Sequence, residues 1–546
     1  MQGKAWTEIT RLAEDMMANG AQPEREDQLA FHVEARDADK VDELRTRLEM
    51  YFGALAKVRP LFDEPDAETR RFLAVVFPAV DAELAAPVAW DAAYALAASD
   101  PDIRSVEPDL PTGFFIEPDE PVNARIAAES AIVKLYCEVD HAPPADRHWA
   151  IKMIKARDGA AFSRSIDRPA AGHGVLVAQP DTGVTANAEL EAGSIAPDGG
   201  WDVIEDRVGA TDPLIKGNPG HGTATGSCVI SRTRGKVEGS APAATLYPIR
   251  AITSVVIHKA GPVARAIERA ILVKAQVVTM SLGGVPSRAV RAAIRRARSE
   301  GIIVLAAAGN CVKLVVWPAR YPECIAVAGC NIYGMPWKGT SRGPSVDITA
   351  PGEQVWHASA QHPDGYKHGQ GTSFAVALTA GAAAQWIGHF GTGAVKAEAA
   401  RRGVPVHELF RTALMQTATP SSLLDPQRHG AGVVNVEALL KLELSAIGTV
   451  KVVVELPGDD PGDNMPQEYE EIYRSMGGSQ PEGAKLNWAL YGGELGAVAL
   501  RRAMSMMVEK QETLENTQPA LSSHTAREAA ISSGDPTLMN WLGVVR

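Results

Sequence analysis

The stretch Gly371-Thr372-Ser373-Phe374-Ala375 runs directly into residues 376–384, which are mostly small and apolar and are typical of a buried helix. The N-terminus of a helix carries partial positive charge and free backbone N–H groups, which can hold a developing oxyanion. Ser373 at the start of such a helix is therefore well placed to act as a nucleophile. Serine is also a preferred N-cap residue, so this stretch alone fits either a reactive or a structural serine.

Three upstream motifs supply the groups that a reactive serine needs. Such a serine requires a base that takes its proton and a carboxylate that orients the base. His221 lies between two glycines at the start of a run of small residues, and Asp181 follows the apolar run 174–178. Asn310 ends another apolar run and offers an amide donor for an oxyanion. Each residue alone also fits a turn, a loop or a helix cap, so the prediction depends on their combination.

In this order the motifs resemble the signatures of the subtilisin-like serine proteases, the subtilases, whose triad follows the order Asp, His, Ser. The matching tripeptides are Asp181-Thr182-Gly183, His221-Gly222-Thr223, Ala308-Gly309-Asn310 and Gly371-Thr372-Ser373. The stretch Ser281-Leu282-Gly283-Gly284 matches the substrate-binding strand of that family. The resemblance covers about residues 146–441, which we expect to form a subtilisin-like catalytic domain.

The resemblance implies a serine endopeptidase that hydrolyses peptide bonds through an acyl-enzyme. In this reading His221 is the general base for Ser373, and Asp181 fixes the tautomer of the imidazole. The side chain of Asn310 and the backbone N–H of Ser373 would form the oxyanion hole. Two alternatives stay open: a peptide ligase or macrocyclase of the same fold, and a catalytically silent peptide-binding protein.

The resemblance also implies a set of substrate-binding residues. They are Ser281, Leu282, Gly283, Gly284, Ala308 and Gly309. Residues 281–284 would pair with the substrate backbone as an added strand. Residues 282–284 and 307–309 would form the walls of the pocket for the P1 residue, and residues 312–317 would close it. Because this last segment is bulky and apolar, we expect a small or medium apolar P1 residue.

Apolar strands alternate with helices between residues 174 and 328. This pattern predicts an α/β fold, with a parallel sheet that helices cover on both faces. Ligands in such sheets bind at the carboxyl ends of the strands. Asp181, Ser281 and Asn310 each lie at the end of an expected strand, so we expect them at one edge of the sheet.

Residues 28–110 show the order β-α-β-β-α-β, which predicts a small ferredoxin-like α+β domain. This domain resembles the inhibitory propeptide of subtilases, whose last strand commonly reads close to Val106-Glu107-Pro108-Asp109. The resemblance implies that the domain is an intramolecular inhibitor of the catalytic domain. An unrelated adaptor domain of the same fold is the alternative.

Two segments flank this domain. Residues 1–27 are expected to form a short amphipathic helix and a polar tail. Residues 111–145 contain five prolines and are expected to be a linker, with a helix at 123–136. In the family, the segment that leaves the propeptide is cut by the enzyme. We therefore expect a processing site between Leu110 and Arg147.

Residues 442–546 match no motif that we can name. We expect a strand at 450–456, an exposed acidic segment at 459–476 and a helix at 486–507. The segment contains no catalytic constellation, so its role stays unassigned. A partner-binding or dimerising extension is one interpretation.

Composition limits the partners and cofactors. The net charge of −12, from 54 basic and 66 acidic residues, argues against nucleic acid as the main partner. Five cysteines without CxxC spacing predict neither a disulfide framework nor a zinc site. We expect all five to be free thiols, with a Cys311–Cys324 bridge as the alternative. No dense Asp and Asn loop marks a calcium site, so no metal ligand and no required cofactor are assigned. Structural calcium bound through backbone carbonyls stays open.

The N-terminal residues lack the apolar segment of a signal peptide. No stretch reaches the roughly 18 apolar residues that a membrane span needs. We therefore expect a cytoplasmic protein without a membrane span. Most subtilases are exported, so non-classical export stays open as the alternative.

Overall fold

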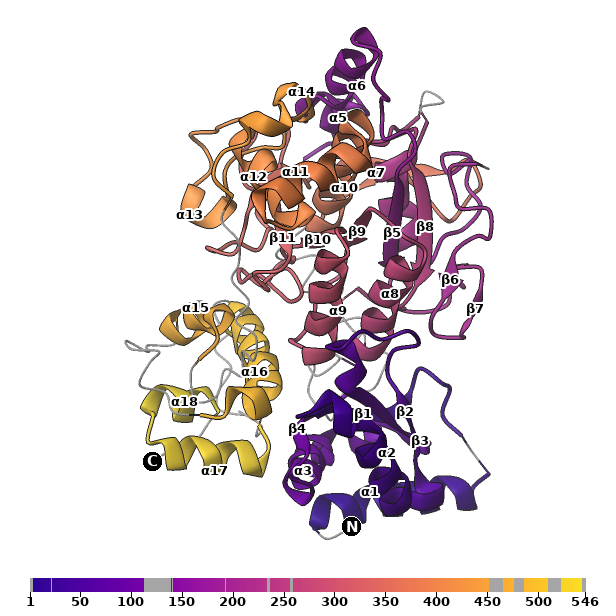
Figure 1. Ribbon diagram of the computed structural model, residues 1–546, viewed down its shortest axis with the longest axis vertical. Helices are drawn as coiled ribbons and strands as arrows, with labels where there is room; N and C mark the ends of the chain where they lie inside the picture. The colour runs from indigo at the N-terminus through magenta and orange to yellow at the C-terminus, as the bar shows by residue number, and fades with distance from the viewer. Residues whose placement is uncertain are drawn as a thin grey trace.

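The computed structural model describes residues 3–20, 22–111, 139, 141–191, 193–232, 236–255, 259–450, 465–475, 486–508 and 522–542; for 501–508 it describes the backbone alone. Three parts follow one another along the chain (Figure 1). An α+β domain lies at the N-terminal end, a larger α/β domain in the middle, and a group of helices at the C-terminal end.

The middle domain is built on an eight-stranded sheet with the order β12-β11-β10-β9-β5-β8-β6-β7. Every neighbouring pair is parallel except β6 and β7. The strands are β5 (Leu176–Asp181), β6 (Trp201–Asp202), β7 (Arg207–Val208), β8 (Thr245–Arg250), β9 (Val277–Met280), β10 (Ile303–Ala307), β11 (Ile325–Cys330) and β12 (Ile348–Pro351). The expected parallel sheet is thus confirmed.

Helices cover both faces of this sheet. The side chains of β10 alternate between the two faces, because successive residues of a strand point to opposite sides. Val304 and Ala306 pack in the cluster of α8 (Ala260–Leu272) and α9 (Arg288–Ser299). Ile303 and Leu305 pack in the opposite cluster. That cluster includes α7 (His221–Ile230), α10 (Thr372–Phe390) and α12 (Val406–Gln416). The other elements of the domain are α5 (Trp149–Met153), α6 (Ala156–Ser165), β13 (Val355–Ala358), β14 (Tyr366–Gly369), α11 (Thr392–Arg402), α13 (Pro426–His429) and α14 (Val436–Lys441).

The N-terminal domain has an antiparallel sheet in the order β2-β3-β1-β4. Its elements are α1 (Lys4–Ala18), β1 (Gln28–Ala35), α2 (Val41–Phe52), β2 (Lys57–Pro60), β3 (Phe72–Asp81), α3 (Ala82–Ser99) and β4 (Ile103–Pro108). Apart from α1, this is the expected β-α-β-β-α-β order. Aromatic side chains of Trp6, Phe31, Phe52 and Phe77 meet in its core.

Helix α3 begins at Ala82 and contains Pro87. Proline lacks an N–H and so makes no intrahelical hydrogen bond at this position. The Asp81 carboxylate accepts hydrogen bonds from the N–H groups of Glu83 and Leu84 and so starts the helix ahead of the proline.

The described residues of the C-terminal part form four helices: α15 (Gln467–Ser475), α16 (Trp488–Val508), α17 (His524–Ser533) and α18 (Pro536–Trp541). The expected exposure of residues 459–476 is wrong for α15, because Tyr469, Ile472 and Tyr473 are buried. These side chains share one face of the helix. Tyr469 packs on Trp317 of the middle domain, and the Tyr473 hydroxyl donates to Asp535 at the start of α18. The strand expected at 450–456 falls almost wholly outside the described residues, as does the helix expected at 123–136.

The cysteine prediction holds in part. Cys228, Cys324 and Cys330 are buried free thiols, so a Cys311–Cys324 bridge is excluded. The expectation that Cys311 is free is wrong, because it takes part in a disulfide. Cys137 lies outside the described residues. Among the described helices, none combines the length and the apolar character that crossing a membrane requires.

Candidate active site

The motif residues meet at the carboxyl edge of the central sheet. Asp181 is the last residue of β5, Ser281 directly follows β9, and Asn310 lies three residues beyond β10. His221 opens α7, and Ser373 is the second residue of α10. The parallel order of the strands brings these segments together, as the sequence pattern predicts.

Asp181 and His221 form a hydrogen-bonded pair in which the carboxylate is buried and the imidazole is partly buried. The Nδ1 atom of His221 lies 2.8 Å from Oδ1 of Asp181. The Thr182 backbone N–H donates to the same carboxylate oxygen at 2.7 Å, and the Thr225 hydroxyl donates to the other oxygen at 3.1 Å. Because Nδ1 faces the carboxylate, Nε2 is the nitrogen that remains to accept a proton. Thr225 was missed in the sequence, although it stands one helical turn after His221.

Glycine is required beside the histidine. A Cβ atom on Gly222 would lie 2.1 Å from the carbonyl oxygen of Gly183, which belongs to the loop after β5. The backbones of this loop and of α7 therefore touch, and any side chain would separate them. This contact brings Asp181 and His221 together and explains Gly222. Gly183 is required because its φ is +95° and a Cβ atom on it would lie 2.6 Å from the Ala210 carbonyl oxygen.

Ser373 lies in the first turn of α10, and its side chain is buried. Its hydroxyl donates to the Ser281 carbonyl at 3.4 Å, and the Ser281 hydroxyl donates to the Ser373 carbonyl at 3.0 Å. Among the described contacts there is no hydrogen bond between Ser373 and His221. Such bonds are often long or poorly aligned before substrate binds and tighten only in the complex.

The side chain of Asn310 is held by the residue before the serine. Its Oδ1 atom accepts the Thr372 N–H at 2.9 Å and the Thr372 hydroxyl at 2.8 Å. A backbone N–H can only donate, so the oxygen of the amide must face Thr372. The Nδ2 group therefore lies on the other side, 3.3 Å from an ideal Cβ on Gly371. Thr372 is a second positioning residue that sequence motifs alone did not single out.

Comparison with known proteins identifies a family that the middle domain matches. The model of the Subtilase family matches residues 172–435. Thermitase of Thermoactinomyces vulgaris is 32% identical over 218 residues, which are 39% of this chain and 75% of thermitase. Subtilisin Savinase of Lederbergia lenta is 30% identical over 293 residues, which are 53% of this chain and 97% of Savinase.

This chain belongs to the subtilase family. It is also 32% identical, over 43% of its length, to a thermostable alkaline protease of Halalkalibacterium halodurans, and the match spans 61% of that relative. A solved structure, that of the prenylagaramide maturation protease PagA, aligns with 52% of this chain and 97% of its own. Its identity is 21% and its TM-score is 0.40.

The stretch predicted to bind substrate, residues 281–284, makes hydrogen bonds within the chain. The Gly283 N–H donates to the Val255 carbonyl at 3.1 Å, and the Gly284 N–H donates to the Trp317 carbonyl at 2.8 Å. The Leu282 side chain is buried. The edge predicted to pair with substrate therefore has to release Gly283 from Val255 before that N–H can bind a peptide.

The two walls of the expected P1 pocket are Gly283 and Gly309, and Val316 fills the space between them. Its Cγ2 atom lies 2.3 Å from an ideal Cβ on Gly283 and 2.9 Å from one on Gly309. The Val316 N–H donates to the Ala308 carbonyl at 2.9 Å, which fixes the segment across the pocket. Val316 therefore occupies the space between the two glycines, whereas the sequence indicated only that residues 312–317 were bulky.

The N-terminal domain docks at the same edge through carboxylates at the end of β4. Glu107 accepts the Arg288 N–H, at the start of α9, at 3.0 Å. Asp109 accepts the N–H groups of Ala260 and Gly261, at the start of α8, at 2.8 and 3.1 Å. Negative charge is stabilised at helix N-termini, so both contacts are favourable. Leu110 then lines one cavity together with Leu282 of the substrate strand.

A second contact between these domains joins Glu34 of β1 to α9. The carboxylate is buried, and it accepts a hydrogen bond from Nε of Arg288. Arg104 and Arg71 of the N-terminal domain also lie 3.3 Å from it. Burial disfavours its charge, but the three guanidinium groups outweigh that effect and lower the pKa of Glu34 to about 2.

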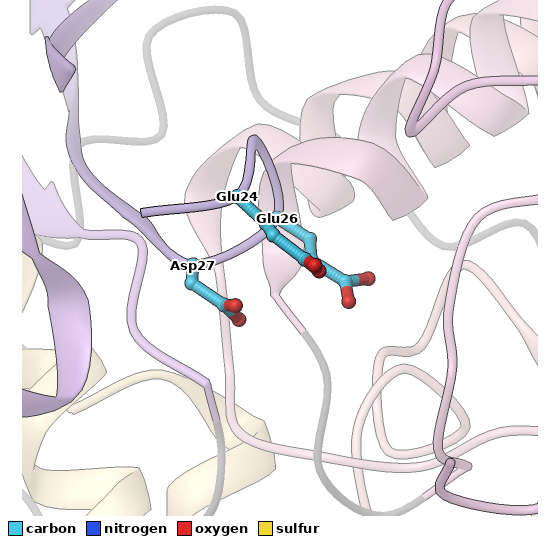
Figure 2. A group of neighbouring side chains, drawn as sticks. All are labelled: Glu24, Glu26 and Asp27. Carbon is cyan, nitrogen blue, oxygen red and sulfur yellow. The ribbon is translucent and has the colours of Figure 1, made fainter. Parts of the chain in front are cut away.

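Three carboxylates point toward one another ahead of β1: Glu24, Glu26 and Asp27 (Figure 2). Their oxygen atoms lie within 4.8 Å of one another. Lys216 of the catalytic domain contacts Glu26 and lies 3.8 Å from Glu24. The cluster is therefore already neutralised in part by an ion pair between domains, and we assign no metal to it.

His357 is a further buried group beside the site. Its ring stacks on Phe374, the residue after Ser373, with 4.7 Å between ring centroids. Burial lowers the pKa of His357 to about 3, so the ring is neutral at physiological pH. It forms part of the floor of the site and was missed in the sequence, because it belongs to none of the motifs.

Proposed function

We propose that this subtilase is a serine endopeptidase that cuts peptide bonds through the triad Asp181, His221 and Ser373. The observation that carries the proposal is the partly buried 2.8 Å pair between Asp181 and Nδ1 of His221, at the sheet edge where Ser373 lies in the first turn of α10. This pair leaves Nε2 of His221 as the acceptor for the serine proton. The reaction requires no cofactor.

In the proposed reaction the Ser373 oxygen attacks the carbonyl carbon of the scissile bond while Nε2 of His221 takes the hydroxyl proton. The tetrahedral intermediate collapses, the C–N bond breaks, and the leaving amine takes the proton from His221. Water then attacks the acyl-enzyme in the same way and restores Ser373. Asp181 holds the imidazole and stabilises its charged form throughout.

The oxyanion would be held by Nδ2 of Asn310 and by the backbone N–H of Ser373. The support for this role is that Thr372 fixes the amide oxygen and so directs the amide nitrogen away from itself. The Ser373 N–H belongs to the first turn of α10, whose amides have no acceptor within the helix. Substrate would bind as a strand along residues 281–284 after Gly283 leaves Val255.

We further propose that the N-terminal domain is an intramolecular inhibitor of the peptidase. It caps the N-termini of α8 and α9 with Asp109 and Glu107, and it brings Leu110 to the cavity shared with Leu282. Leu110 thus lies beside the predicted substrate-binding strand. A protein substrate would have to displace it.

The test is an incubation of the purified wild type beside Ser373→Ala, followed by intact mass measurement and N-terminal sequencing. We expect only the wild type to lose a segment that ends between residues 110 and 147. If neither protein is cut, self-processing is wrong; if both are cut alike, another protease is responsible. Adding an amine nucleophile identifies a ligase, because the product mass then contains the amine.

A further inference from the structure

The C-terminal helices contact both other domains. We use the name C-terminal unit for residues 465–475, 486–508 and 522–542, which carry α15 to α18. These helices lie beside α3 and β4 of the N-terminal domain in Figure 1. Their apolar side chains also join the core cluster of α8 and α9. The unit therefore lies across the line where the N-terminal and catalytic domains meet.

On the side of the N-terminal domain, the contacts are buried hydrogen bonds. The Tyr94 hydroxyl of α3 donates to the Glu494 carboxylate of α16 at 2.6 Å, and Glu494 is 2% exposed. The Ser523 hydroxyl donates to the same carboxylate at 2.9 Å. Asp91 of α3 accepts the N–H and the hydroxyl of Thr525 at 3.1 and 2.6 Å. Two separate points of α3 are thus held.

On the side of the catalytic domain, the contacts are ion pairs and aromatic packing. Glu468 of α15 lies 2.7 Å from Arg291 of α9. Glu471 lies 3.1 Å from Arg320, whose guanidinium also donates to the Glu468 carbonyl at 3.0 Å. The ring of Tyr469 packs on Trp317 with 5.5 Å between centroids. This side of the C-terminal unit is part of the hydrophobic core of the catalytic domain.

Within one turn, helix α16 contacts both the N-terminal domain and the catalytic domain. A Cβ atom on Gly493 would lie 2.9 Å from the Trp90 ring of the N-terminal domain. A Cβ atom on Gly496 would lie 2.3 Å from Pro286 of the catalytic domain. The two glycines let one rigid helix touch both domains closely, so that a movement of either domain away from the other breaks a packed contact.

We propose that the C-terminal unit is a second docking surface for the N-terminal domain, and that it retains this domain after the connecting segment is cut. This rests on the proposed function only in that the enzyme itself makes the cut. After the cut, two sets of contacts keep the N-terminal domain bound: those of the carboxylates at the end of β4 and those of the C-terminal unit. Activation requires loss of both sets of contacts, and so is slower than cleavage.

The test uses the full chain with Ser373→Ala and a recognition sequence for an added site-specific protease between residues 115 and 125. After the cut, dissociation of the labelled N-terminal fragment is followed by size-exclusion chromatography. Tyr94→Phe removes one hydrogen bond to a buried carboxylate, so we expect dissociation about 10- to 100-fold faster. Asp91→Asn, at the partly exposed rim, should act in the same direction without a risk to folding.

Tyr51→Phe is the matched control, because it makes the same chemical change on an exposed tyrosine of the same domain. We expect it to leave the dissociation rate unchanged. The proposal is overturned if Tyr94→Phe and Asp91→Asn dissociate at the rate of Tyr51→Phe. The added protease makes the cut and Ser373 is absent, so this outcome does not depend on whether the chain is a peptidase.

Discussion

The substrate cleft and the interface with the N-terminal domain lie at the same edge of the sheet but are built differently. In the cleft, Nδ1 of His221 and Oδ1 of Asn310 are held by hydrogen bonds within the chain. The other polar atom of each side chain, Nε2 or Nδ2, is left for the proposed reaction. In the interface, Glu107 and Asp109 accept helix N–H groups, and Glu34 is surrounded by guanidinium groups.

This difference separates the effects expected of substitutions in the two regions. A change in the cleft should alter the chemistry and leave the N-terminal domain bound. A change in the interface should alter retention of that domain and leave the chemistry of the released enzyme unchanged. A substitution that did both would contradict the separation.

Ser373→Ala should have the largest effect. Turnover of a peptide substrate, measured after the N-terminal domain has been cut off by an added protease and then separated from the enzyme, should fall by about 10⁶-fold, the size known for the same change in subtilisin, a relative. The thermal midpoint of the intact chain should stay close to that of the wild type. Residual activity within tenfold of the wild type would contradict a nucleophilic role for this serine.

Asn310→Ala should lower kcat by about 10²- to 10³-fold, a range also taken from subtilisin, with little change in KM. The reason is that the amide acts on the oxyanion rather than on the bound substrate. Thr372→Val keeps the side-chain shape and removes one of the two bonds to Oδ1, so we expect a smaller fall in kcat. A rise in KM with kcat unchanged would indicate that Asn310 contributes to substrate binding instead.

Val316→Gly should change which peptides are cut. Removing the side chain between Gly283 and Gly309 deepens the P1 pocket. We expect kcat/KM for P1 Leu or Phe to rise, relative to P1 Ala, by about 10- to 200-fold. A P1 peptide library read by mass spectrometry measures this ratio, and Val316→Ala should give an intermediate value. An unchanged ratio would show that Val316 does not limit the pocket.

Acid should speed the release of the N-terminal fragment, by a smaller factor than the effects of the substitutions above. The pKa of Glu34 is about 2, below its ordinary value near 4.5, so its contribution to docking is complete above about pH 4.5 and is lost as the pH falls towards 2. Only Arg288 of its three arginines belongs to the catalytic domain. We therefore expect about tenfold faster release of the N-terminal fragment at pH 3 than at pH 6.

Glu34→Gln is the control for this acid effect and should remove most of it. Burial raises the pKa of the neighbouring Glu107, so the contribution of Glu107 to docking has the opposite dependence on pH. An acceleration of release from pH 6 to pH 3 that is equally large in Glu34→Gln and in the parent chain would assign the effect to another group.

The sequence was sufficient for the sheet and for the four motif residues. Each of Asp181, Asn310 and Ser281 follows a short apolar strand, and parallel strands bring such ends to one edge. The glycines of the motifs mark backbone contacts, as Gly222 against Gly183 illustrates. The residues that form the sequence motifs are thus also the residues that position the site.

Contacts between distant segments could not be predicted from the sequence. Tyr94 and Glu494 are 400 positions apart, and neither belongs to a motif. The acidic composition of α15 suggested an exposed helix. The helix is instead buried, because its carboxylates pair with Arg291 and Arg320, and these partners could not be predicted from the sequence. Val316 was visible only as a bulky residue, because its place between two glycines depends on the path of the chain.

The most direct measurement is labelling with a fluorophosphonate, followed by peptide mapping of the modified residue. We predict one adduct on Ser373, slow formation in the intact chain, faster formation once the N-terminal domain is removed, and none in Ser373→Ala. Labelling at the same rate with and without the N-terminal domain would contradict inhibition. An adduct elsewhere, or none on Ser373 after removal of the domain, would contradict the proposed active site.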